Sequence, residues 1–160
     1  MEAPLTCLLF CEGKNDYKFV QNLHNLDKFK YHTKGWRFSL DRGSGQSPKE
    51  ILEKCRNKMR QASYNLVICF IDQDVIVRIY PNSWKEELIK LSDLFPKITI
   101  FWHENCLEDE LNKVLQIPGA KKKELNNKAN KNPELFINKT YWRRLIGIIK
   151  EYKSHPTTTT

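Results

Sequence analysis

The sequence has no long apolar segment and no cysteine pair of the kind that binds metals. Its most apolar run, LVICFI at residues 66–71, is far shorter than the ~20 residues of a membrane-spanning helix. The N-terminus MEAPLTCLLF has no basic region ahead of its apolar residues, so we expect no secretory signal and a cytoplasmic protein. The five cysteines form no CxxC motif, and we expect buried, reduced thiols.

Two common catalytic motifs are also missing. The sequence has no G-x-x-x-x-G-K-[ST], which excludes a P-loop, and His103 is followed by Glu104-Asn105 rather than completing an H-E-x-x-H zinc motif. We expect His103 to be a hydrogen-bonded residue at a strand end, although a role in proton transfer stays open. Candidate chemistry must therefore come from the acidic and basic residues.

Positive charge is concentrated at the C-terminal end of the chain. Residues 118–160 hold ten Lys and Arg against three Asp and Glu, whereas the rest of the chain is nearly neutral. This asymmetry favours a polyanionic partner, namely DNA or RNA, although a solvated basic surface would give the same composition. The candidate contacts are Lys121, Lys122, Lys123, Lys128, Lys131, Arg143 and Arg144, with Tyr141 and Trp142 nearby for stacking on bases or, for Trp142, for core packing.

Apolar strands alternate with amphipathic helical segments along the first 117 residues. This order predicts an α/β fold of the Rossmann-like kind, with a four-stranded, mainly parallel sheet flanked by helices. The expected strands are Thr6–Phe10, Trp36–Leu40, Leu66–Ile71 and Ile98–Trp102.

The remaining residues predict an appendage to this domain. We divide the chain into a domain at 1–117, a basic helical extension at 118–153 and a disordered tail at 154–160. Within the extension, the polar segment 120–134 predicts a linker or flexible loop, and 138–152 returns to helical spacing. A helix of this type would also suit a homodimer, which the sequence leaves open.

Acidic residues follow three of the predicted strands. They are Glu12 with Asp16, the pair Asp72 and Asp74, and Glu108. The carboxyl ends of parallel strands lie at one edge of a sheet, so we expect these acids to cluster there. Clustered carboxylates repel one another unless a cation lies among them, and oxygen ligands favour Mg²⁺ or Mn²⁺.

Each acid also has a purely structural explanation. Asp16 would cap a helix, Asp72 and Asp74 would cap the segment after their strand, and Glu108 would lie in the first turn of a helix. The combination of E-G-x-x-D after the first strand and D-x-D after the third is more specific than any single acid.

These residues resemble a Toprim domain, the metal-binding module of topoisomerases, primases and several nucleases. Toprim domains have Glu-Gly after the first strand and D-x-D after the third, which correspond to Glu12-Gly13 and Asp72-Gln73-Asp74. EGKND is similar to the form found in small ribosomal-RNA maturases and OLD-type nucleases, and GSGQSPKEILEKC is similar to the glycine-rich loop of RloB-like proteins. The segment after the fourth strand keeps Glu108 but lacks the proline of that branch.

The resemblance implies roles for individual residues. Glu12 would be a metal ligand or general base, Asp72 and Asp74 would be metal ligands, and Asp16 and Glu108 would assist or hold a second ion. Arg42 and the loop after it would lie near the phosphate of the substrate.

The resulting hypothesis is a Mg²⁺- or Mn²⁺-dependent nuclease that hydrolyses phosphodiester bonds. The alternative is a non-catalytic module on the same fold that binds nucleic acid or regulates a partner. A receiver domain fits less well, since no lysine ends the fourth strand, and nucleotidyl transfer would require further domains.

Overall fold

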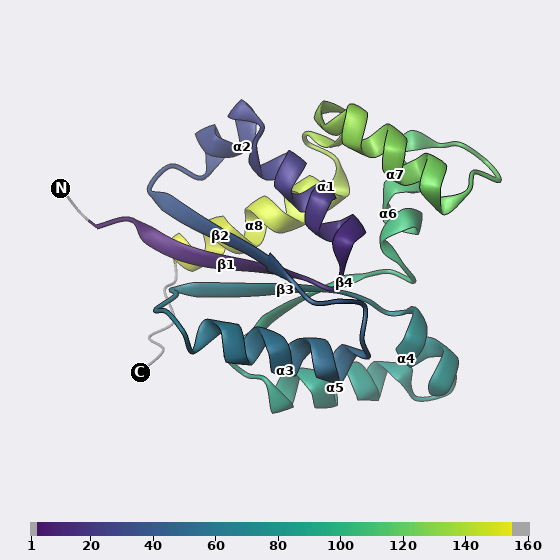
Figure 1. The fold of residues 1–160 in the computed structure, drawn as a ribbon, viewed down its shortest axis with the longest axis horizontal. Helices are drawn as coiled ribbons and strands as arrows, with labels where there is room; N and C mark the ends of the chain where they lie inside the picture. Colours follow the sequence, from purple (N-terminus) through teal and green to yellow (C-terminus); the bar gives the residue numbers. More distant parts are fainter. Residues whose placement is uncertain (1–2, 155–160) are drawn as a thin grey trace.

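The computed structural model describes residues 3–154 and contains one parallel sheet with helices on both faces (Figure 1). The strands lie in the order β2-β1-β3-β4, and each neighbouring pair is parallel. This arrangement confirms the predicted α/β class and the four-stranded parallel sheet. The strands are β1 (Leu5–Cys11), β2 (Trp36–Arg42), β3 (Leu66–Asp72) and β4 (Thr99–His103).

The helices form one layer on each face of the sheet. In Figure 1, α3 and α5 lie below the strands, while α1, α2, α7 and α8 lie above them. The bounds are α1 (Lys14–His24), α2 (Asp27–His32), α3 (Pro48–Met59), α4 (Asp74–Ile79), α5 (Trp84–Leu94), α6 (Leu107–Leu115), α7 (Lys122–Lys131), the short 3-10 helix η1 (Pro133–Phe136) and α8 (Thr140–Ser154).

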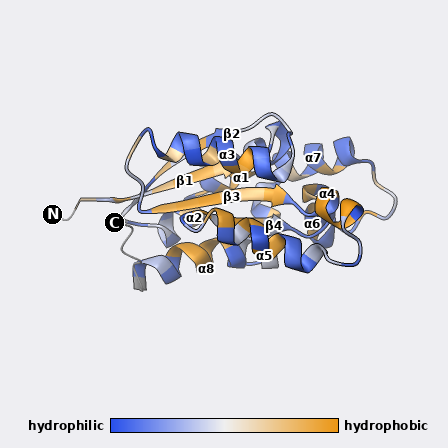
Figure 2. Ribbon diagram, turned by 90° about the horizontal axis from the view of Figure 1, so that it is seen from below, coloured by the Kyte–Doolittle hydropathy of each residue, from blue (hydrophilic) through white to orange (hydrophobic). Residues whose placement is uncertain are grey.

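The central strands β1 and β3 are buried on both faces, as their continuous apolar sequences require. Successive side chains of β1 enter two different cores: Cys7 and Leu9 pack with α1 and α8, whereas Leu8 and Phe10 pack with α3 and α5. Figure 2 shows these strands as mainly hydrophobic, whereas hydrophobic and hydrophilic residues are mixed along the helices around them. The two outer strands of the sheet are therefore β2 and β4.

Helix α8 is part of the main core, so residues 118–153 are not an appendage. Trp142, Leu145 and Ile149 are buried in the same cluster as Phe19 of α1. Tyr141 is also only 4% exposed, so neither aromatic residue is available to stack on a base. The predicted boundary at residue 117 depended on the positive charge of the residues after it. That charge lies on the exposed face of α8, whereas the opposite face of this helix packs in the core.

The segment predicted as a linker at 120–134 is mainly helical. It forms α7 and η1, and Leu125 and Ala129 of α7 are buried against α1 and α6. Because these two residues are four positions apart, they lie on one face of the helix. Two apolar residues are too few to indicate a buried helix in a segment whose other residues are mostly polar. The predicted tail at 154–160 lies outside the described residues, apart from the backbone of Ser154 at the end of α8.

Two further observations concern the chain as a whole. All five cysteines are buried and free, as expected. Among residues 3–154, no helix is both long and apolar enough to cross a membrane.

Replacing a buried residue of α8 tests whether that helix is required for folding. Leu145 is 1% exposed, so Leu145→Ala is expected to lower the free energy of unfolding by about 2–5 kcal/mol, measured by urea denaturation. The matched control Arg143→Ala, on the exposed face, is expected to change it by less than about 0.5 kcal/mol. Similar small effects for both variants would contradict the packing described here.

Candidate functional site

The acids meet where the chain reverses its direction across the sheet. From β1 the chain moves outward to β2 and then crosses back to β3 on the other side of β1. Ligands of open α/β sheets bind at such a point, outside the carboxyl ends of the strands. A cavity of about 160 Å³ lies there and is lined by Glu12, Gly13, Lys14, Asn15, Asp16, Asp72, Leu107 and Glu108. The structure thus brings together four of the five predicted acids.

Glu12 and Asp72, which both line this cavity, are in direct contact. The Oε2 atom of Glu12 accepts a hydrogen bond from the backbone N–H of Asp72 at 3.0 Å. Burial, followed by the negative charge of Asp72, raises the pKa of Glu12 to about 8. Near neutral pH, and with no metal ion bound, the Glu12 carboxyl is therefore mostly protonated.

Asp16 holds the turn between β1 and α1. Its Oδ2 accepts from the backbone N–H of Glu12 at 2.8 Å, and its Oδ1 accepts from that of Gly13 at 2.9 Å. Burial raises its pKa to about 6, although these hydrogen bonds favour the charged form. Gly13 is the N-cap of α1, and Asp16, three residues later, is the acceptor that closes the turn. Because both carboxylate oxygens bind the backbone, Asp16 positions Glu12.

The glycine-rich loop after β2 is fixed beside Glu12. The N–H of Gly43 donates to Cys11 O at 2.9 Å, and that of Gly45 donates to Glu12 O at 3.1 Å. A Cβ atom at Gly43 would lie 3.2 Å from Glu12 O, a tight contact that a larger residue could make only if the backbone shifted by a few tenths of an ångström. Arg42, which is exposed, is paired with Cys11 in the sheet and so lies at the edge of the site.

Asp72 is oriented by a buried chain of hydrogen bonds. His103 Nδ1 and the backbone N–H of Leu107 lie 2.8 Å and 3.0 Å from Asp72 Oδ1, and Tyr141 Oη lies 2.8 Å from His103 Nε2. A carboxylate only accepts hydrogen bonds, so Nδ1 carries the proton, and in the neutral ring Nε2 accepts from the tyrosine hydroxyl. Burial raises the pKa of Tyr141 well above its usual value, which keeps the phenol protonated.

His103 is hydrogen-bonded at the end of β4, which confirms the expectation from the sequence. Its partner Tyr141 was not predicted. Tyr141 is 69 residues from Asp72 along the chain, and no local pattern connects them.

Glu108 is held by two residues of α7. Its Oε2 accepts from Asn126 Nδ2 at 3.0 Å, and its Oε1 lies 3.8 Å from Lys122 Nζ. The pKa of Lys122 is raised, first by Cys106 and then by the acids Glu108, Asp74 and Asp72. Lys122 was predicted as a phosphate contact and lies beside the acids, so a positive charge already adjoins the carboxylates.

Asp74 lies outside the cavity. It is the first residue of α4, and its Oδ1 accepts from the N–H of Val75 at 2.8 Å. The N-cap of α4 is Gln73, and no side chain forms a capping hydrogen bond there, so the expectation that Asp74 caps the segment after β3 is wrong. Its charge still contributes to the raised pKa of Glu12. The structure therefore does not place Asp72 and Asp74 together around one cavity.

A larger cavity of about 1000 Å³ is bordered by β4, α6 and the start of α8. It is also lined by Gln73, the residue between Asp72 and Asp74. Trp84 and Trp102 are partly exposed in it, and the predicted phosphate contacts Arg143 and Arg144 line it together with Lys139.

Arg144 already has protein partners: its guanidinium donates to Glu110 Oε2 at 3.0 Å and to Trp102 O at 2.8 Å. Arg143 is exposed and forms no side-chain hydrogen bond with a described residue. The other predicted contacts line a separate hollow along α7 that Arg143 does not line, and they are Lys121, Lys123, Lys128 and Lys131.

The acidic cavity fits a magnesium or manganese ion only in part. Its donors are carboxylate oxygens, the type these ions prefer. No three His, Cys, Asp or Glu side chains within residues 3–154 are arranged to hold a metal ion. Mg²⁺, however, is commonly bound by one or two carboxylates together with water and substrate phosphates. Glu12 and Asp72 are sufficient for a site of that kind.

No family model matches this chain, and comparisons with the curated proteins and with solved structures found no match either. The resemblance to Toprim domains thus stays a prediction from the residues quoted above.

The raised pKa values predict how stability depends on pH. Between about pH 4.5 and 8, Glu12 is ionised in the unfolded chain but protonated in the folded protein, and Asp16 acts in the same direction between about 3.8 and 6. The folded state then binds more protons, so the free energy of unfolding, measured in chelator, is expected to fall as pH rises through this range. Glu12→Gln cannot ionise and is expected to lose most of the decline above pH 6. An identical decline in both proteins would contradict this assignment.

Proposed function

We propose that this protein is a Mg²⁺- or Mn²⁺-dependent phosphodiesterase that cleaves nucleic acid. The proposal depends chiefly on one observation: Glu12 and Asp72, from two adjacent parallel strands, line the same cavity, and burial with mutual repulsion raises the pKa of Glu12 to about 8. Such a pair is stabilised either by a proton or by a cation. At neutral pH a divalent cation would displace that proton and use both carboxylates.

The ion would be held by Glu12 and Asp72 in the cavity that Glu108 also lines. A bound magnesium ion supplies a positive charge that orients phosphate and activates water. Oxygens are available for this role because, among the described residues, Asp72 Oδ2 has no hydrogen-bond partner and the only hydrogen bond of the Glu12 side chain uses Oε2.

The surrounding residues would keep these carboxylates in position. The hydrogen bonds from His103 and Leu107 fix the orientation of Asp72, and those to Asp16 fix the backbone of Glu12. Lys14 at the rim of the cavity and Arg42 at its edge supply positive charge for a phosphate group. Partners of this kind typically change metal affinity or activity by about 10–100-fold when removed.

The larger cavity next to the acids supports nucleic acid as the substrate class. Lys139 and Arg143 offer cations for phosphates, and the exposed parts of Trp84 and Trp102 offer surfaces for bases. The basic C-terminal sequence and the resemblance to Toprim nucleases agree with this class.

The second candidate function is a non-catalytic module that binds nucleic acid. It is favoured by the hydrogen bonds that the acids already make within the protein. Asp72 Oδ1 has two donors, and Glu108 is held by Asn126 and lies near Lys122. In such a module, Lys122 would take the place of a metal ion in balancing the acids.

Cleavage assays on labelled single- and double-stranded DNA and RNA distinguish the two functions. With Mg²⁺ or Mn²⁺ we expect cleavage, and with chelator none. Glu12→Gln and Asp72→Asn are expected to lower the rate by about 100-fold or more, since each removes a charged group of the reaction site. The matched control Asp93→Asn, on the exposed surface of α5, is expected to cleave like the wild type.

Circular dichroism and thermal unfolding of each variant verify that it is folded. Cleavage that persists in chelator, or in both acidic-site variants, would contradict the proposal. Binding of nucleic acid by the wild type without any cleavage would favour the non-catalytic module.

Nucleic-acid binding is expected to depend on Arg143 through its charge. Arg143→Gln should weaken binding of a labelled oligonucleotide, measured by fluorescence anisotropy at several salt concentrations. The slope of log K against log salt should also become shallower by about one unit, the change expected when one phosphate contact is lost. The matched control Lys54→Gln removes one exposed charge from α3, away from this cavity, and is expected to keep the wild-type slope. Equal slopes for Arg143→Gln and wild type would exclude Arg143 from the interface.

A further inference from the structure

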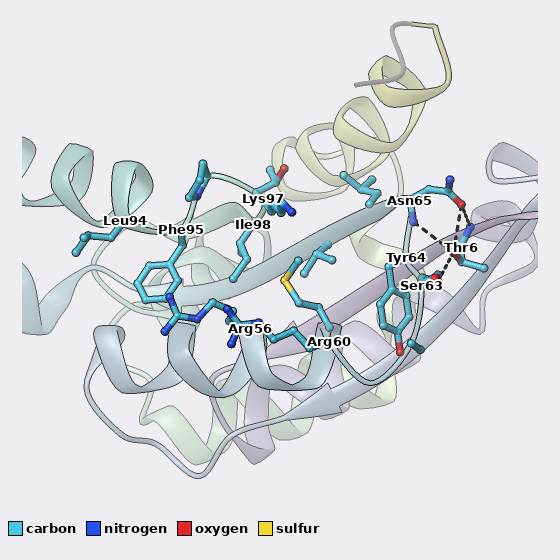
Figure 3. Close-up of a pocket in the computed structure, with 16 residues that line it drawn as sticks. Thr6, Arg56, Arg60, Ser63, Tyr64, Asn65, Leu94, Phe95, Lys97 and Ile98 are labelled. Atoms are coloured by element: carbon cyan, nitrogen blue, oxygen red, sulfur yellow. Dashed lines mark hydrogen bonds between the residues drawn. The ribbon is translucent and has the colours of Figure 1, made fainter. Parts of the chain in front are cut away.

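A second large cavity lies at the edge of the sheet opposite the acids (Figure 3). Its volume is about 750 Å³, and it lies where β3 and β4 begin, between the C-terminal parts of α3 and α5. Leu66, which begins β3, lines this cavity, whereas Asp72, which ends the same strand, lines the acidic one. At about 3.3 Å per residue, the two sites are roughly 20 Å apart.

The charged residues that line this cavity are cations. Arg56 of α3 and Arg60, the residue that follows this helix, line one side of the cavity, and Lys97 lines it from the connection between α5 and β4 (Figure 3). No aspartate or glutamate of the described chain lines the cavity, and none of the three cations forms an ion pair with a described residue. A hollow lined by one sign of charge concentrates the opposite charge.

Arg56 is fixed in place but lacks an acceptor. Its guanidinium lies 4.9 Å from the centre of the Phe95 ring, a cation–π contact that holds the side chain against the wall. Its Nε atom is buried and has no hydrogen-bond partner among the described residues. The helix dipole favours cations in the last turns of α3, which explains a positive charge at Arg56. The dipole does not explain why the buried Nε–H of Arg56 has no acceptor.

The remaining walls combine apolar surface with a rigid polar rim. Met59, Phe95 and Ile98 supply the apolar surface. At the rim, Thr6 and Asn65 bind each other, with the Thr6 N–H donating to Asn65 Oδ1 at 2.9 Å and the Asn65 N–H donating to Thr6 O at 2.9 Å (Figure 3). The cavity therefore suits a molecule with an anionic group and an apolar or ring-shaped part.

We propose that this cavity binds a phosphate monoester attached to a compact organic group such as a nucleoside. The guanidinium groups of Arg56 and Arg60 would pair with phosphate oxygens, a geometry for which arginine is well suited, and Lys97 would add a third positive charge. A free mononucleotide and the 5′-phosphate end of a nucleic acid carry the same group. This inference is independent of the phosphodiesterase activity proposed above, since it uses none of the acidic residues.

Calorimetric titration of the full-length protein tests the proposal. The probes are inorganic phosphate, AMP, a short oligonucleotide with a 5′-phosphate and the same oligonucleotide without it, all in chelator so that no cleavage occurs. We expect AMP, or the phosphorylated oligonucleotide in preference to its unphosphorylated form, to bind. The preferred probe identifies the source of the phosphate monoester, and inorganic phosphate measures the contribution of the phosphate group alone.

Variants assign the binding to this cavity. Arg60 and Lys97 are exposed, so the double variant Arg60→Gln with Lys97→Gln is expected to fold and to bind about tenfold more weakly or worse. Arg56→Gln is expected to weaken binding as well, while its stability is followed by thermal unfolding because it also loses the contact with Phe95. The matched control Lys54→Gln, on the same helix but outside the cavity, should bind like the wild type.

Three results would overturn the proposal. They are the absence of binding by every probe up to about 10 mM, equal binding by the double variant and the wild type, and equal affinity for the two oligonucleotides together with no binding of AMP. Glu12→Gln is expected to leave this binding unchanged, so a failure of the nuclease proposal can be told apart from a failure of this one.

Discussion

The candidate site depends on the parallel pairing of β1 with β3. Both strands are continuous apolar runs, so both must be covered on two faces, and the centre of the sheet is the only place that provides this. Their register pairs Cys11 with Phe70, which leaves Glu12 and Asp72 within hydrogen-bond distance just beyond the last paired residues. A shift of one residue would turn the side chains of a strand to the opposite faces and separate the two carboxylates.

Placing acids so close together is unfavourable, and the protein compensates with hydrogen bonds from three directions. Asp16 binds the backbone of the first turn, His103 and Tyr141 support Asp72, and Asn126 supports Glu108. Two of these supports come from α7 and α8. The basic C-terminal region therefore shapes the acidic site from within the core, in addition to any contact of its exposed cations with a polyanion.

The two ends of the strands differ in their charged residues. The carboxyl ends carry the acids together with cations such as Lys14, whereas the charged residues in the cavity where β3 and β4 begin are arginine and lysine. A net charge of +8 reveals nothing of this difference, since it sums over both edges. The buried charges at each edge are stabilised in different ways. The acids accept hydrogen bonds from the protein, whereas Arg56 contacts an aromatic ring.

The sequence by itself determined the α/β class, the four strands and the gathering of acids at one edge, because these follow from apolar periodicity and from the geometry of parallel strands. It did not determine α7, whose buried stripe is only Leu125 and Ala129, or the partners of individual acids. Asp72 meets Tyr141 through His103, and Asp74 does not line the cavity, although both acids belong to one motif. These contacts join residues far apart in the chain, so only tertiary packing decided them.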